Sequence, residues 1–125
     1  MMINEKMAWA LQALAQPSEQ QLNLFPDFAN AADELALSWE EVIEDEDLSG
    51  LSESQKKALS VLDEYIVSIS GKKNAHLWTN EALKNNIEWS KIRALASAAI
   101  EELGWQKVNL KPSKWAIYVD SNQAD

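Results

Sequence analysis

The chain has 125 residues, a length at which a single domain can bury one hydrophobic core without covalent cross-links. Cysteine is absent, which excludes a disulfide framework, a zinc–thiolate site and a cysteine nucleophile, and fits the cytoplasmic location that we expect. The net charge of −9 is unevenly spread: residues 1–71 sum to −11 and residues 72–125 to +2, so the two halves should attract different partners.

The first predicted helix ends before Pro17. Apolar residues recur along it at helical spacing, at Ile3, Met7, Leu11 and Leu14. A secretory signal peptide is the alternative, because an apolar stretch follows Lys6, but Gln12 interrupts that stretch. No apolar run approaches the roughly 20 residues of a transmembrane helix, so no membrane association is expected.

A short turn and a second helix come next. Ser18 and Gln21 have the spacing of a capping box, which predicts a short turn before the loop at Phe25 and Pro26. A second helix is predicted over residues 28–43, with an apolar stripe made of Phe28, Ala32, Leu35, Trp39 and Ile43. It leads into four consecutive acids at residues 44–47. We interpret this run as a solvated linker rather than a metal site, because it lacks the alternation and glycine of a calcium loop.

Three further helices are predicted in the second half. Ser52 and Gln55 form a capping box for a helix that ends at Gly71, and Lys72 and Lys73 then suit the negative helix end better than a phosphate site. A short helix capped by Thr79 or Asn80 runs to about residue 85. A last helix extends from about residue 88 to Gly104. The apolar residues of the first and last of these helices are Leu59, Leu62, Ile66, Ile69, Ile92, Leu95, Ala96, Ala99, Ile100 and Leu103.

After Gly104 the apolar period changes from 3.6 to 2. Val108 and Leu110 alternate with polar residues, residues 111–113 supply a turn, and Trp115, Ile117 and Val119 alternate again. The expected fold is therefore mainly α, a single domain over residues 1–125. It comprises an acidic helical segment, residues 1–48, and a C-terminal unit, residues 52–120, that ends in a β-hairpin.

The element order over residues 52–120 resembles the winged helix-turn-helix superfamily. The resemblance is carried by residues 77–83 (LWTNEAL), residues 92–95 (IRAL) and residues 103–105 (LGW), which resemble its second helix, its recognition helix and the entry to its wing. It implies a recognition helix in the DNA major groove and a wing on the phosphate backbone. The implied nucleic-acid contacts are Lys91 and Arg93 on the helix and Lys107, Lys111 and Lys114 on the wing.

Charge argues against DNA as the partner. The outward face of the supposed recognition helix, formed by Ser90, Ala94, Ser97 and Glu101, is small and neutral and then acidic. The wing lysines can equally protect an exposed hairpin edge. Nucleic-acid binding is therefore the disfavoured alternative, whereas a face of small residues permits close approach of another helix.

No catalytic, cofactor or metal site is predicted. His76 is the only histidine, which rules out histidine-rich zinc sites, and the chain has no Gly-x-Ser-x-Gly, Walker or GxGxxG motif. The acidic run should stay hydrated and ionised, whereas catalytic carboxyl groups need burial. We therefore expect no enzyme and no cofactor.

The leading hypothesis is a non-enzymatic cytoplasmic interaction or regulatory protein with a protein partner. Its acidic half could dock a basic protein surface, with Trp39 as anchor and Glu40, Glu41 and Glu44 as a charged rim. The alternative for Trp39 is burial in the core. The alternative function is a winged-helix transcription regulator that binds DNA, and a homodimer is compatible with either.

Overall fold

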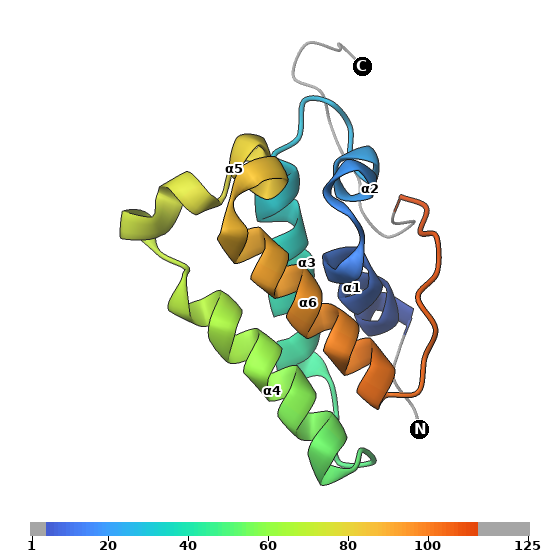
Figure 1. Cartoon of the computed structure of the whole chain (residues 1–125). Coiled ribbons are helices and arrows are strands. Elements are labelled where there is room, and N and C mark those ends of the chain that lie inside the picture. The colour runs from blue at the N-terminus through green and yellow to red at the C-terminus, as the bar shows by residue number, and fades with distance from the viewer. Residues whose placement is uncertain (1–4, 113–125) are drawn as a thin grey trace.

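The computed structural model describes residues 5–112, which form six α-helices and one short 3-10 helix (Figure 1). In chain order they are α1 (Glu5–Ala15), α2 (Ser18–Asn23), α3 (Ala31–Asp45), α4 (Glu53–Ser68), η1 (Lys72–Leu77), α5 (Asn80–Asn85) and α6 (Ile87–Glu102). The mainly α prediction is confirmed. Each helix that the apolar spacing predicts is present, although α3 begins later and ends later than residues 28–43.

Side-chain caps explain where several helices begin. Ser52 and Gln55 form the predicted capping box at the start of α4, and Thr79 accepts a hydrogen bond from the Ala82 amide at the start of α5. Asn30 accepts from the Asp33 amide, so α3 begins after it rather than at Phe28, which is 50% exposed. Each cap satisfies a backbone N–H that has no partner inside its own helix.

α6 lies at the centre of the fold, with α4 packed on one side and α1 on the other, while α1 also packs on α3 (Figure 1). The fully buried large side chains come from both halves of the sequence: Met7, Leu11, Leu14, Leu35, Trp39, Leu59, Leu62, Leu83, Trp89, Ile92 and Ile100. The acidic helical segment therefore packs on the C-terminal unit through a shared core. The apolar stripes of neighbouring helices can leave water only by facing one another.

The predicted β-hairpin is wrong for the part of it that the structure describes. Residues 105–112 are extended, but they lie along α1 and form no strand (Figure 1). The backbone groups of α1 are used within its own helix, so only its side chains can bond to this segment. The second predicted strand, with Trp115, Ile117 and Val119, lies outside the described residues, as does Lys114.

Because no hairpin forms within residues 5–112, the prediction of a winged-helix-like fold is also wrong for this part of the chain. Residues 5–112 contain the expected helices but no wing. The residues that were expected to begin the wing lie alongside α1 instead. Ser90, Ala94 and Glu101 of α6 are exposed as expected, and Ser97 is half-buried. The described chain is thus a helical bundle with an extended C-terminal segment.

Candidate functional site

A cleft of about 310 Å³ lies between α3 and α4, and we name it the acidic cleft. The residues that define it are Glu40, Ile43 and Glu44 on α3 and Asp63, Ile66 and Val67 on α4, with Trp39 at its floor. Residues 39, 40, 43 and 44 share one face of α3, and residues 63, 66 and 67 share one face of α4, because residues three and four apart are neighbours on a helix. Two helices of the shared core therefore position these side chains.

The walls of the acidic cleft are apolar and its charges are all negative. Val67 is 64% exposed, Glu40 and Glu44 are exposed, and Asp63 is half-buried. The Trp39 indole donates a hydrogen bond from Nε1 to Asp63 Oδ1 at 3.0 Å, which fixes the orientation of this carboxylate. No Lys or Arg is among the residues that line the cleft, so its electrostatic potential is negative.

The structure brings together three of the four residues predicted to face a partner. Trp39, Glu40 and Glu44 all line the cleft, whereas Glu41 is exposed outside it. Trp39 is fully buried, so it supports the floor of the cleft and cannot protrude as an anchor. That part of the prediction is corrected, and burial in the core, its stated alternative, is correct.

Sequence reasoning missed the contribution of α4 to this cleft. Asp63 and Val67 were not assigned any role, since only the apolar stripe of this helix was interpreted. The signal lay in Val67, an apolar residue that falls outside the helical stripe of Leu59, Leu62 and Ile66 and is therefore a candidate for an exposed apolar side chain.

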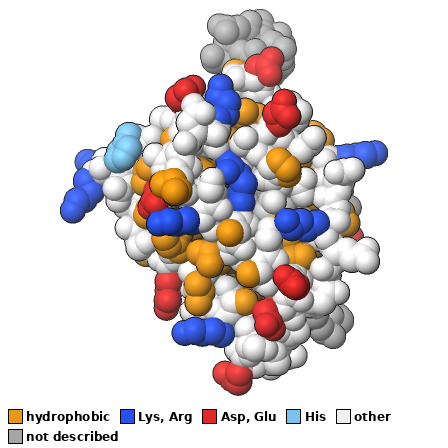
Figure 2. All heavy atoms as spheres, in the orientation of Figure 1, with side chains coloured by type: hydrophobic (Ala, Val, Ile, Leu, Met, Phe, Trp, Pro, Cys, Tyr) orange, Lys and Arg blue, Asp and Glu red, His pale blue; other side chains and the backbone are white. Residues whose placement is uncertain are grey.

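The predicted nucleic-acid contacts that the structure describes do not all line one cleft. Lys91 forms an ion pair with Glu88 at 3.6 Å and lines a groove between α4 and α6. Lys111 lines another cleft beside Trp9. Figure 2 shows Lys and Arg side chains spread over this face of the molecule rather than gathered into one patch.

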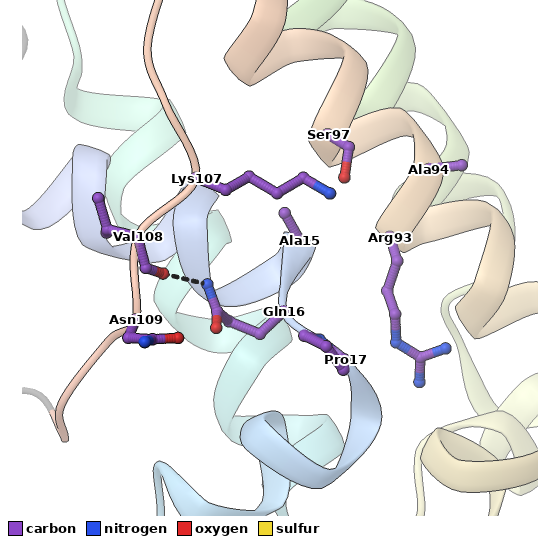
Figure 3. A pocket seen from close by; sticks show the side chains of 9 residues that line it. All are labelled: Ala15, Gln16, Pro17, Arg93, Ala94, Ser97, Lys107, Val108 and Asn109. Atoms are coloured by element: carbon purple, nitrogen blue, oxygen red, sulfur yellow. Dashed lines mark hydrogen bonds between the residues drawn. The ribbon is translucent and has the colours of Figure 1, made fainter.

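Of the four residues of that set that the structure describes, only Arg93 and Lys107 line the same cleft, whose volume is about 520 Å³ (Figure 3). Residues at the end of α1, on α6 and in the extended segment form this second cleft. We name it the basic cleft, and define it by Gln16, Pro17, Arg93, Ser97, Lys107 and Asn109.

The described side chains form no metal-binding group in either cleft. Among residues 5–112, no group of three or more His, Asp or Glu side chains is placed to hold a metal ion. Tyr65 has a raised pKa because of burial and its hydrogen bond to Glu88, but it lies in neither cleft. Within the same range no helix is long and apolar enough to cross a bilayer.

Comparison with known proteins gives no relative from which a role could be transferred: no family model, no curated protein and no solved structure matches the chain. A role for this chain is therefore inferred from its clefts and its charge distribution.

Proposed function

We propose that this protein is a non-enzymatic interaction protein that binds a basic segment of a protein partner in the acidic cleft. One observation carries the proposal: Glu40, Glu44 and Asp63 surround a cleft with apolar walls, and no cation lines it. A lysine or arginine side chain matches both features, because it combines an aliphatic stem with a charged end.

The contacts available in the cleft favour such a side chain in a definite orientation. The stem would lie against Ile43 and Val67, and the charged end would meet the carboxylates of Glu40 and Glu44. Asp63 uses Oδ1 to accept from Trp39, and no other described residue donates to its second oxygen. That oxygen can therefore accept a charge-assisted hydrogen bond from the partner.

Long-range charge supports the same partner chemistry. Residues 1–71 carry a net charge of −11, so a basic segment would be attracted to this half before contact. Electrostatic attraction of this kind raises the association rate and weakens with added salt.

The test uses a short lysine- and leucine-containing peptide with a fluorescent label, and fluorescence anisotropy as the measurement. The Glu40→Gln/Glu44→Gln variant should bind this peptide about tenfold more weakly than the unsubstituted protein, since it loses two charge-assisted contacts. The control variant is Glu19→Gln/Glu41→Gln, which makes the same change in net charge at two exposed residues outside the cleft.

The comparison of the two variants decides whether the cleft is the site. A clear loss in the first variant with little change in the second supports the proposal. Equal weakening in both would show that only net charge attracts the peptide, and this would overturn the proposal.

The alternative, a regulator that binds DNA, has weaker support, because Lys91, Arg93 and Lys111 line three different clefts or grooves. Its test is binding of random-sequence duplex at low salt. Affinity that falls steeply with salt and with Lys107→Ala, Lys111→Ala and Lys114→Ala would favour it over the protein partner.

A further inference from the structure

The basic cleft is formed where the end of α1 meets α6 and the extended segment that follows α6. Gln16 and Pro17 come from the end of α1, Arg93 and Ser97 from successive turns of α6, and Lys107 from the extended segment (Figure 3). In this view Lys107 reaches across the cleft toward Ser97, and Arg93 lies one turn away on the same helix. Two cations, one on α6 and one on the extended segment, thus line a single opening.

The positive charge of this cleft is not neutralised by the residues that the structure describes. No Asp or Glu is among its lining residues, although the chain as a whole carries a charge of −9. Neither Arg93 nor Lys107 forms an ion pair with any residue from 5 to 112. An uncompensated charge is costly where it is removed from water, so a bound anion would stabilise this arrangement.

Arg93 is held in place by neutral partners. Its Nε donates to Gln21 Oε1 at 3.0 Å, and another guanidinium N–H donates to the Leu83 carbonyl oxygen. Gln21 is fully buried, and its own amide donates to the Ala13 and Leu14 carbonyl oxygens at 3.1 Å. The guanidinium is thus fixed by the core while its charge has no counter-ion among the described residues, and burial lowers its pKa accordingly.

Further donors of this cleft are also available. The Lys107 ammonium, the Ser97 hydroxyl and the Asn109 amide form no hydrogen bond to another residue within 5–112. A phosphate group offers several acceptor oxygens and as much as two negative charges, which suits two cations with neutral donors beside them. The volume of about 520 Å³ lies in the range of small-molecule sites.

We propose that the basic cleft binds a small phosphorylated molecule, with its phosphate between Arg93 and Lys107 and its organic part against Ala15 and Pro17. Ser97 and Asn109 donate hydrogen bonds to the phosphate. This site is separate from the acidic cleft and does not depend on the function proposed for that cleft.

The test is a titration of the ¹⁵N-labelled full chain with phenyl phosphate and, separately, with inorganic phosphate, followed by NMR at constant ionic strength. We expect saturable shifts confined to the amides of residues 15–17, 93–97 and 107–109, with phenyl phosphate binding more tightly than inorganic phosphate. Shifts spread over surface lysines, or none at these amides, would overturn the proposal.

Two pairs of variants distinguish the cleft from general charge. Lys107→Glu should weaken phenyl phosphate binding about tenfold or more, whereas Lys111→Glu, an equal charge change in the same segment but outside this cleft, should leave it nearly unchanged. Ser97→Asp should weaken binding, and Ser90→Asp on the exposed face of α6 should not. Equal effects within either pair would overturn the proposal, as would a DNA duplex that displaces phenyl phosphate from this cleft.

Discussion

Two tryptophan N–H groups are satisfied inside the fold by backbone carbonyl oxygens of neighbouring elements. Trp89 donates to the Leu77 carbonyl oxygen at 2.7 Å and Trp78 to that of Ile69 at 3.0 Å. Their rings meet edge to face, with centroids 5.4 Å apart. Each indole therefore contributes apolar area and also joins η1 to a neighbouring helix without leaving a polar atom unpaired.

Two residues of α6 that share an apolar stripe in the sequence should differ in their effect on stability. Ile92 is fully buried, whereas Leu95 is half-buried and lines the groove beside α4. Ile92→Ala should lower the free energy of unfolding by about 2–5 kcal/mol because it leaves a cavity. Leu95→Ala should cost clearly less than Ile92→Ala. Urea denaturation followed by circular dichroism measures both, and equal losses would contradict the burial described for α6.

Tyr65 should make stability depend on alkaline pH. Burial, and then the 2.8 Å hydrogen bond to Glu88, raise the pKa of Tyr65 from 10.0 to about 12. Between these two pH values the folded protein keeps the phenol proton, whereas the unfolded chain has released it. The stabilisation is therefore complete below about pH 10 and is lost as the pH rises from about 10 to about 12.

Absorbance titration of tyrosinate checks this pKa. The chain has two tyrosines, so Tyr118→Phe leaves Tyr65 as the only one, and its midpoint should lie near pH 12. Adding Glu88→Gln should lower the midpoint, since the charge of the acceptor is removed. An ordinary midpoint near pH 10 in the Tyr118→Phe protein would contradict the hydrogen bond.

At the scale of elements, side chains of α1 hold the extended C-terminal segment. Gln12 Nε2 donates to the Gln106 carbonyl oxygen at 2.9 Å, and the Val108 amide donates to Gln12 Oε1 at 3.3 Å. Gln16 and Trp9 donate to the carbonyl oxygens of residues 108 and 111. The side chains of Trp9, Gln12 and Gln16 thus provide hydrogen bonds that a neighbouring strand would provide in a β-sheet.

Gln12→Leu should loosen this segment without unfolding the helices. The substitution replaces the amide with an apolar side chain of similar size and removes both hydrogen bonds to residues 106 and 108. Amide exchange at Val108 should accelerate, while the amides of α6 stay protected. Gln20→Leu, at an exposed residue of α2, is the control and should change neither. Unchanged exchange at Val108 would show that Gln12 does not hold the segment.

At the scale of the whole molecule, ion pairs do not connect the helices that the structure describes. The three pairs join Lys56 to Glu53, Lys84 to Glu81 and Lys91 to Glu88, each within one helix. Such exposed local pairs contribute little. Repulsion within a chain of charge −9 therefore outweighs the attraction that salt would remove.

Added sodium chloride should accordingly raise the melting temperature. Between about 0.01 M and about 0.15 M salt the Debye length falls from about 30 Å to about 8 Å, which screens the repulsion between acids on α3 and the segment that follows. Thermal unfolding followed by circular dichroism is the measurement. The rise should be smaller in Glu41→Gln/Glu44→Gln, and a melting temperature that falls with salt would show that attractive pairs dominate.

The acidic run illustrates how far charge alone predicts structure. Glu44 and Asp47 are exposed as expected, but Glu46 is half-buried and α3 extends to Asp45. Asp47 accepts a hydrogen bond from the Ser49 amide at 3.0 Å, which lowers its pKa and shapes the turn toward α4. The run is thus partly helix and partly a hydrogen-bonded turn, not a uniform linker.

Local features of the sequence were enough to locate the α-helices and several of their boundaries, but not η1 or the ends of α3. Apolar spacing selects the buried face of each helix, the box of Ser52 and Gln55 and the cap at Thr79 act within four residues, and the glycines at residues 71 and 104 adopt positive φ. These determinants depend on neighbours along the chain, so they can be interpreted without a tertiary structure.

Only the tertiary structure decided what lies between the helices. The alternation at residues 108 and 110 predicts an extended backbone correctly, but its partner is α1, because period 2 specifies extension and not the neighbour that satisfies the peptide groups. Likewise Asp63 of α4 lines the same cleft as Glu40 of α3, and Lys107 of the extended segment lines the same cleft as Arg93 of α6. Both clefts arise from helix packing, which no spacing within a single segment encodes.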